Sequence, residues 1–181
     1  MSHNLYAEAM STEVQPAGAR PATIASSDGA AWLTPAEMRA WRAFAEVNGH
    51  LMAALEADLA PHGITFGDYE VLVQLSEADE HQLRMCDLAE RLGLSPSGLT
   101  RRLDGLVTAA YVERRPSCAD RRVMLATLTD AGLLAMQAAA GDHVTSVRRH
   151  LIDHLDDSQI AALGDIFTIV GTALGRQLTI A

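Results

Sequence analysis

The chain has 181 residues, a formal net charge of −9, 49% hydrophobic residues and only 4% aromatic residues. This length allows one domain with a sizeable core plus an accessory element, and the abundance of Ala and Leu favours helices. No apolar run approaches the roughly 18 residues of a membrane span and no signal pattern opens the chain, so we expect a cytoplasmic protein with no membrane partner. The two cysteines, Cys86 and Cys118, are too few for a disulfide framework or a zinc ribbon.

Basic residues gather in one segment of the sequence. The chain contains no lysine, and seven of its 14 arginines fall between residues 91 and 122, a window with only three acidic residues. The other 20 of the 23 acidic residues lie outside that window. A basic segment on an acidic body fits a protein that touches a polyanion with one face, although an unevenly charged solvated surface gives the same pattern.

The N-terminal part of the chain predicts a tail followed by one long helix. Residues 1–30 mix Ala, Ser, Thr, Gly and Pro without periodicity, which predicts disorder. Thr34 is a good N-cap, and Glu37 three residues later completes a capping box. Apolar residues then recur at helical spacing until the breaker "APHGI", so we expect a helix within residues 31–64 that ends near Ala60.

The middle of the chain predicts a helix-turn-helix. Thr65 is placed to cap a second helix, and a polar connection "SEADEHQ" follows it. A short helix over about residues 84–92 ends at Gly93, and Ser95 then caps a further helix that has proline at its first position. Two short helices joined by a tight glycine turn are typical of a helix-turn-helix.

A hairpin and two long helices complete the predicted order. The stretches "YVERRP" and "RRVMLATLT" read as short strands around the turn "PSCAD", which places a wing directly after the helix-turn-helix. Thr129 caps a helix expected to reach Leu155, and a last apolar helix follows Gln159. The predicted fold class is therefore mainly α with a small β-hairpin, a winged helix-turn-helix over residues 65–128 between an N-terminal helix and C-terminal helices over residues 129–181.

The helix capped by Ser95 has one apolar face on a 3.6-residue period, made of Leu99, Leu103, Leu106 and Ala110. Packing of that face inward leaves short hydroxyl side chains at the helix start, where a recognition helix enters the major groove. The guanidinium of Arg101 can bond to guanine O6 and N7 as a bidentate pair. An arginine at the wing tip suits a narrow minor groove, and Asp120 could orient that arginine by an ion pair. The predicted DNA-binding residues are Ser95, Ser97, Thr100, Arg101, Arg102, Asp120, Arg121 and Arg122.

The segment "LAERLGLSPSGLTRRLDGLVTAAYVERRPSCADRRVMLATLTDAG" resembles the core of the MarR family of bacterial winged-helix regulators. The shared features are a leucine-alanine pair, a capped recognition helix, "VERR", an aspartate-x-arginine wing tip and "LTDAG". The resemblance extends over about residues 34–178 and implies that the family's wing aspartate and arginine are Asp120 and Arg122 here. The family usually has a glycine before the first wing strand, where this chain has Ala110, so we expect an altered turn but the same fold.

The resemblance also implies partners. Members are homodimers whose first, fifth and sixth helices form the dimer region, so we expect residues 31–64 and 129–181 to form the dimer. We also expect the dimer to bind double-stranded DNA at an inverted-repeat operator. Many members bind small aromatic acids or phenols between the dimer helices and the DNA-binding lobe, so we expect a repressor released by such a ligand and needing no cofactor. The ligand-binding candidates are Trp41, His50, His62 and Tyr69, although packing or surface roles suit each of them as well.

Three other functions fit parts of the sequence. His143, His150 and His154 share one face of a continuous helix, which would suit a metal sensor. Cys118 in the wing turn would suit a peroxide sensor, whereas Cys86 sits beside an apolar pattern and is expected to be buried. A winged helix that contacts only protein is a third alternative, but it would not need arginines at the wing tip. No phosphate-binding loop, nucleophile elbow or zinc-protease motif is present, so we do not expect an enzyme.

Overall fold

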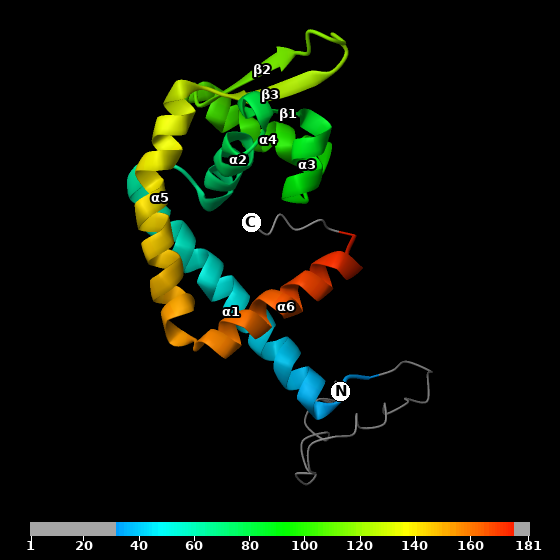
Figure 1. The fold of residues 1–181 in the computed structure, drawn as a ribbon, viewed down its shortest axis with the longest axis vertical. Coiled ribbons are helices and arrows are strands. Elements are labelled where there is room, and N and C mark those ends of the chain that lie inside the picture. Colours follow the sequence, from blue (N-terminus) through cyan, green and yellow to red (C-terminus); the bar gives the residue numbers. More distant parts are fainter. Residues whose placement is uncertain (1–31, 176–181) are drawn as a thin grey trace, which may run out of the picture. The chain divides into compact units, whose positions relative to one another are not determined.

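The computed structural model describes residues 32–175, so the predicted disordered tail over residues 1–30 lies outside the described part. The chain divides into two compact units, Met1–His50 and Leu51–Ala181. Figure 1 shows the elements. In chain order they are α1 (Pro35–Leu59), α2 (Phe66–Ser76), β1 (Gln82–Arg84), α3 (Met85–Leu92), α4 (Pro96–Thr108), β2 (Val112–Pro116), β3 (Met124–Leu128), α5 (Asp130–His150) and α6 (Asp157–Ala173), with short 3-10 turns at Ala60–His62, Asp79–His81 and Ile152–His154. The mainly α fold with a small sheet is confirmed.

The helix starts follow the predicted caps. The Thr34 N–H donates to Glu37 at 2.8 Å, and the Glu37 N–H donates back to the Thr34 hydroxyl at 3.3 Å, which completes the capping box of α1. Thr65 forms a second capping box with Asp68, and the hydroxyl of Ser95 caps α4. These bonds satisfy N–H groups that a helix start otherwise leaves without a partner, so local sequence suffices to set where these three helices begin. Helix α3 is different, because it begins after Arg84 with no side-chain cap.

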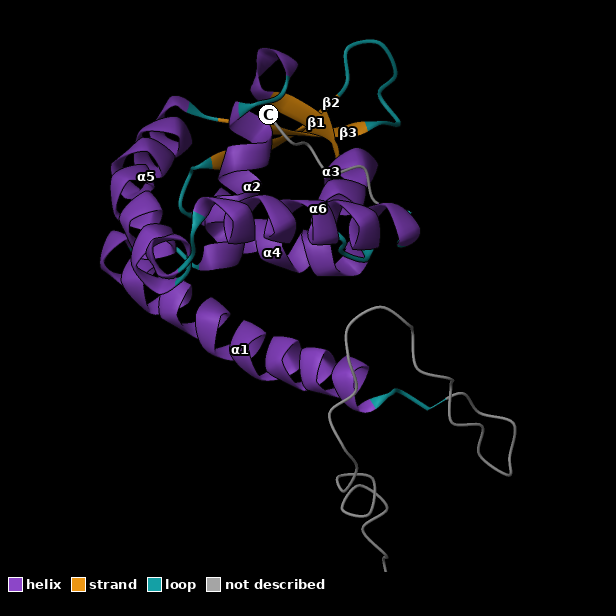
Figure 2. Cartoon of the chain, turned by 60° about the horizontal axis from the view of Figure 1, so that its bottom comes forward, coloured by secondary structure: helices purple, strands orange, loops and turns teal. Residues whose placement is uncertain are grey.

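The sheet has three antiparallel strands in the order β1-β3-β2, whereas the sequence predicts only the β2–β3 hairpin. The hairpin register pairs Val112 with Leu128 and Pro116 with Met124. The additional strand β1 pairs Gln82 with Thr127 on the other side of β3. Figure 2 shows the hairpin continuing past the sheet into a loop. Three residues carry no readable alternation, so β1 arises from pairing with a distant strand rather than from its own pattern.

The core of the Leu51–Ala181 unit lies between α2, α3, α4, α5 and the sheet. Its completely buried side chains include Leu59, Val71, Leu72, Leu75, Leu88 and Leu103. Three members of the predicted inward face of α4, Leu99, Leu103 and Leu106, are at most 2% exposed, which confirms that face. Ala110 does not belong to it: α4 ends at Thr108, and Ala110 is exposed with a φ of +59° in the following turn.

The C-terminal helices differ from the prediction at their boundary. Helix α5 ends at His150 instead of reaching Leu155, because Leu151 leaves helical geometry with φ −136°. Helix α6 begins at Asp157 with a capping box between Asp156 and Gln159. None of the residues that the structure describes in α6 is buried, although the helix is rich in Ile, Phe, Val and Leu. None of the helices in residues 32–175 combines the length and apolar character needed to cross a membrane.

The described part of the Met1–His50 unit consists of the first turns of α1 and the residues leading into it. Trp41 and Phe44 pack ring to ring with centroids 6.1 Å apart, yet 56% of Trp41 and 44% of Phe44 remain exposed. Val47, one turn further along, is 58% exposed. An apolar stripe of this size left open to water is unusual for a surface helix.

Candidate nucleic-acid interface

The start of α4 presents short polar side chains and one arginine to solvent. Ser95, Ser97, Thr100 and Arg101 are all exposed. The Ser95 hydroxyl accepts from the Gly98 N–H at 3.1 Å and lies 3.2 Å from the Ser97 hydroxyl, while the Thr100 hydroxyl donates to the Pro96 carbonyl at 2.9 Å. The side chains are thus held close to the backbone, so a polyanion can approach the start of the helix closely.

Arg101 and Arg102 are neighbours in sequence but lie in different environments. Arg101 is exposed, whereas Arg102 is half-buried and its guanidinium fills the space beside Gly67 of α2 that a Cβ would occupy. Burial raises the pKa of Glu70 on the same helix, and the nearby charge of Arg102 partly opposes that rise. The sequence prediction grouped the two arginines, but the structure directs Arg102 toward α2.

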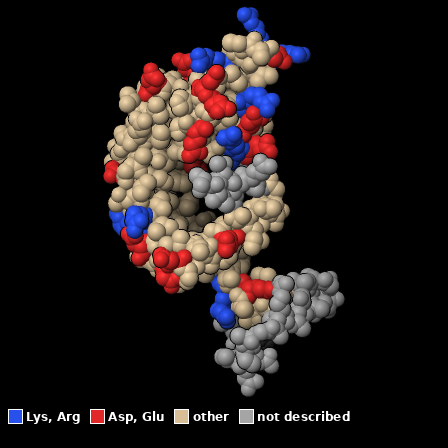
Figure 3. Space-filling model, viewed as in Figure 1, with Lys and Arg blue, Asp and Glu red and all other residues tan. Residues whose placement is uncertain are grey.

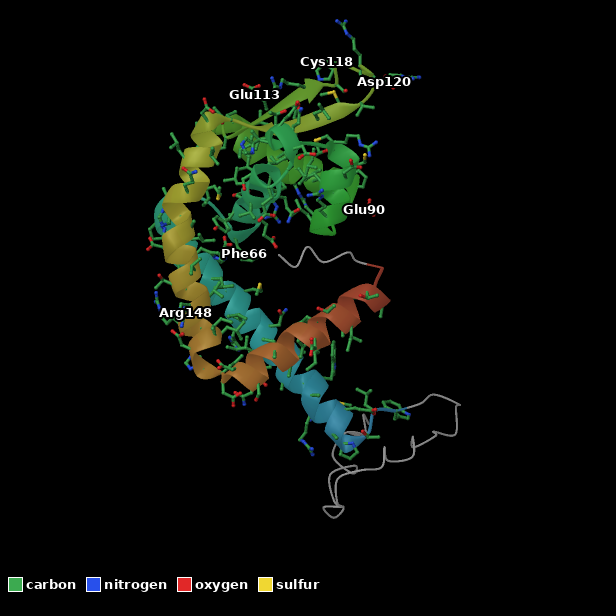
Figure 4. All side chains as sticks on the ribbon, viewed as in Figure 1. Phe66, Glu90, Glu113, Cys118, Asp120 and Arg148 are labelled. Atoms are coloured by element: carbon green, nitrogen blue, oxygen red, sulfur yellow. The ribbon has the colours of Figure 1, made fainter. Side chains whose placement is uncertain are left out.

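The wing tip holds two exposed arginines and one aspartate that organises the turn. Asp120 accepts from the Arg122 backbone N–H at 3.0 Å and from the Arg122 guanidinium at 3.2 Å, so it fixes both the turn and the side chain. These bonds from Arg122 lower the pKa of Asp120 below its usual value, which keeps the carboxylate charged. The side chain of Arg122 is 91% exposed and Arg121 is exposed as well. Figure 3 shows basic side chains projecting from the end of the hairpin, and Figure 4 places Asp120 there.

A further arginine, which the sequence placed only within the basic segment, joins the wing to α4. Arg114 on β2 donates from Nη2 to the Thr100 carbonyl at 2.7 Å and to the Asp104 carboxylate at 2.9 Å. Its side chain is only 27% exposed. Asp104 is exposed on α4, and it is the acceptor for an arginine of the strand that follows it in sequence.

The four ligand-binding candidates fall in both units. Trp41 and His50 belong to the Met1–His50 unit, and both are exposed. His62 and Tyr69 belong to the Leu51–Ala181 unit and lie along α5. His62 is within 2.8 Å of the Asp142 carboxylate, and the buried ring of Tyr69 lies 4.5 Å from the ring of His143. Burial raises the pKa of Tyr69, so its phenol stays neutral.

The three histidines considered for a metal site do not share one face of a helix. His143 packs against the rings of Phe66 and Tyr69, and burial lowers its pKa. His150 bonds to Asp58 at 3.0 Å, and His154 lies beyond the end of α5 in a separate 3-10 turn. The continuous helix face assumed from the spacing is therefore interrupted, and within residues 32–175 no cluster of three potential metal ligands forms.

The two cysteines are both free and exposed. This corrects the expectation for Cys86, which was predicted to be buried. Cys86 lies in the first turn of α3, where its thiol donates to the Asp87 carboxylate at 3.3 Å, while Leu88 and Ala89 supply the buried side of that helix. One position along a helix rotates a side chain by about 100°, which is enough to move Cys86 off the apolar face.

Comparisons with known proteins agree with this geometry. Residues 62–123 match a family model described as MarR family. The crystal structure of AbsC, a MarR family transcriptional regulator from Streptomyces coelicolor, is 41% identical over 81% of this chain and 99% of that chain, with a TM-score of 0.76. Sco3205, a MarR family transcriptional regulator from the same organism whose structure is in complex with DNA, is 32% identical over 82% of this chain and 96% of its own, with a TM-score of 0.76.

A curated relative gives the same assignment. The HTH-type transcriptional repressor YetL of Bacillus subtilis is 26% identical over 67% of this chain and 75% of its own length. AbsC, Sco3205 and YetL are all transcriptional regulators rather than enzymes. The identity to AbsC over almost its whole length, together with the winged helix-turn-helix described above, shows that the chain belongs to the MarR family and is a DNA-binding transcriptional regulator.

Proposed function

We propose that the chain is a homodimeric repressor that binds an inverted-repeat operator through α4 and the wing, and that a small aromatic or phenolic ligand releases it from DNA. The observation that carries this proposal is the pair of exposed basic elements in one lobe, Arg101 on α4 and Arg122 at the wing tip. The proposal divides the chain into a DNA-binding lobe over residues 65–128 and dimer regions over residues 31–64 and 129–181.

The proposed contacts follow from exposure and side-chain length. Ser95, Ser97 and Thr100 are short enough to let α4 sit deep in the major groove, where Arg101 reads a guanine. Arg121 and Arg122 enter the adjacent minor groove, with Asp120 as the residue that orients Arg122. We leave Arg102 out of the contact set, although it was among the predicted DNA-binding residues, because its guanidinium is packed beside Gly67.

Exposed apolar side chains support the proposed dimer. On α6 they are Ile166, Phe167, Ile169 and Val170, which are 43–69% exposed. The first turns of α1 leave Trp41, Phe44 and Val47 exposed in the same way. Apolar patches of this kind on a soluble chain usually mark a surface that another protein covers, and a second copy is the partner that the family assignment favours.

The charge distribution fits a protein that binds DNA with one face. The chain carries −9 overall, so its acidic surface disfavours contact with DNA except where the arginines of α4 and the wing concentrate. This arrangement suppresses non-specific binding while leaving operator contacts intact. A regulator of this kind acts where the chromosome is, which for a bacterial protein means the cytoplasm.

Repression and ligand release are the finer parts of the proposal. YetL, described as a repressor, is the relative that supports the sign of regulation. For the ligand, the support is an aromatic group at the α2–α5 seam. There the rings of Phe66 and Tyr69 flank His143, whose Nδ1 is buried with no hydrogen-bond partner among the described residues. We propose that a small aromatic ligand binds beside these rings, with the imidazole as its polar partner.

The DNA-binding proposal is tested by recovering genomic fragments that the protein retains and titrating the recovered operator with purified variants. Arg101→Ala and Arg122→Ala should each weaken binding by about 1–3 kcal/mol, and Arg101→Ala should also relax preference at one base pair in each half-site. Arg148→Ala is the matched control, because Arg148 lies on α5 away from the wing and pairs with Asp153 at 2.6 Å. Unchanged operator binding by both Arg101→Ala and Arg122→Ala would refute the assigned surface.

The dimer is tested independently of DNA. Sedimentation of the parent at micromolar concentration should give a dimer. Ile169→Asp places a charge on a side chain that is 69% exposed in one copy, so it should leave the fold of each copy intact while shifting the equilibrium to monomer. A parent that sediments as a monomer and still binds the operator tightly contradicts this part of the proposal.

A further inference from the structure

We propose that Arg114 is a positioning residue that joins the wing to the recognition helix, so that α4 and the wing bind DNA as one rigid element. Arg114 touches no DNA in this proposal; its guanidinium acts on the two elements that do. The inference rests on the DNA-binding surface proposed above.

The alternation of side chains along β2 directs Arg114 toward α4. Val112 is 1% exposed and packs in the core, and Arg114, two residues later, lies on the same face of the strand. Glu113 and Arg115 point to the other face, where both are more than half exposed and pair at 3.6 Å. Arg115 is therefore a surface arginine, whereas its neighbour Arg114 is turned inward.

The guanidinium of Arg114 makes two bonds to one turn of α4. Nη2 donates to the Thr100 carbonyl at 2.7 Å and to the Asp104 carboxylate at 2.9 Å, and both distances are those of well-formed charge-assisted bonds. Thr100 directly precedes Arg101, so the strand is attached beside the residue proposed to read a base. The wing leaves the lobe only two residues after Arg114, at the end of β2 (Pro116).

Stability alone does not account for an arginine at this place. Its Nε is buried and has no hydrogen-bond partner among the described residues, which costs free energy that an apolar side chain of the same length would avoid. The arginine instead restricts geometry. Its two hydrogen bonds fix the angle between β2 and α4, whereas an apolar contact would let the two elements slide past each other. Because α4 and the wing must enter neighbouring grooves together, fixing their relative positions beforehand reduces the conformational entropy lost on binding DNA.

The test is a double-mutant cycle on the operator, read by titration and by hydroxyl-radical footprinting. In the parent, Arg122→Ala should weaken binding about 5- to 150-fold. In an Arg114→Met background the sheet remains but the link between β2 and α4 is lost, so adding Arg122→Ala should change binding less than about twofold. Arg114→Met alone should lose protection at the wing contacts while keeping it over the α4 contacts. Arg115→Met, on the exposed face of the same strand, should leave the effect of Arg122→Ala unchanged.

Arg114→Lys separates positioning from simple charge. It keeps the positive charge, but its nitrogen is one atom closer to the backbone than Nη2 and lacks the planar fork, so it should behave like Arg114→Met. Full recovery by Arg114→Lys, or an equal effect of Arg122→Ala in the parent and in the Arg114→Met background, overturns the inference. A parent that shows no specific footprint at all refutes the proposed function itself, so the two failures are distinguishable.

Discussion

Ala110 occupies a position that glycine suits better, and replacing it gives a sharp test of the turn between α4 and the wing. The Tyr111 N–H donates to the Leu106 carbonyl at 2.8 Å, and the Ala110 N–H donates to the Val107 carbonyl at 3.0 Å. This pair of bonds is the Schellman pattern, in which the residue after the C-cap is left-handed. Ala110 has a φ of +59°, as that pattern requires.

The expected effect of Ala110→Gly is a gain in stability. A left-handed backbone costs a residue with a Cβ roughly 1–2 kcal/mol, and glycine removes that cost. Glycine also makes the unfolded chain more flexible, which takes back about 0.4–1 kcal/mol. Because the methyl group of Ala110 is exposed, its removal loses little packing. The net gain should be about 0.5–1 kcal/mol, or about 1–4 °C in Tm for a chain of this size.

The preceding residue supplies a matched control of opposite sign. Ala109 is also exposed, but it has ordinary helical geometry with φ −75°, so Ala109→Gly should destabilise by about 0.5–1 kcal/mol. Thermal and urea unfolding of both variants and the parent, at one fixed protein concentration, makes the comparison. If Ala110→Gly destabilises the protein as much as Ala109→Gly does, the left-handed turn assigned to Ala110 is wrong.

Three further predictions test other parts of the structure. Gly132→Ala should destabilise by about 1–3 kcal/mol in urea unfolding, because its Cβ would clash with the Tyr111 carbonyl; an effect near zero would mean that α5 does not pack there. Burial lowers the pKa of His143, so the unfolded state binds more protons, and the free energy of unfolding should fall as pH drops below the usual histidine pKa of 6.5. His143→Gln should flatten this pH dependence between about pH 8 and about pH 5.5. An unchanged slope of unfolding free energy against pH would contradict the burial of His143. Log operator affinity should fall with log salt at a slope of roughly −4 to −8, and binding should require half-site centres about 10 bp apart or a multiple of that; a flat response would remove the arginines from the interface.

Local signals in the sequence were enough to set the element boundaries that depend on neighbouring residues. Thr65, Ser95 and Thr129 begin their helices as predicted, because each hydroxyl bonds to an N–H three residues away. Gly93 ends α3, and Gly63 ends the 3-10 turn that follows α1, both in left-handed geometry for the same local reason. The order of helices and the hairpin was predictable from these signals and from the apolar periods between them.

The site was only partly predictable. The exposure of Arg101 and the pairing of Asp120 with Arg122 follow from helical period and a two-residue spacing, both of which are local. The placement of Arg102 is not local, because it depends on α2 presenting Gly67 at the point where the guanidinium arrives. The helical period turns Arg102 about 100° away from Arg101, toward the edge of the apolar face, but only the neighbouring helix shows what its guanidinium contacts.

Long-range packing decided the remaining features. Strand β1 exists because Gln82, Leu83 and Arg84 pair with a strand some forty residues later, and three residues alone carry no strand signal. His143 and His154 do not share a helix face, because α5 ends at His150 and His154 lies in the 3-10 turn beyond it. Arg114 acquired its partners only when β2 folded back onto α4, across a turn that sequence spacing cannot orient. Caps and periods act through bonds between near neighbours, whereas these contacts depend on where separate elements meet in space.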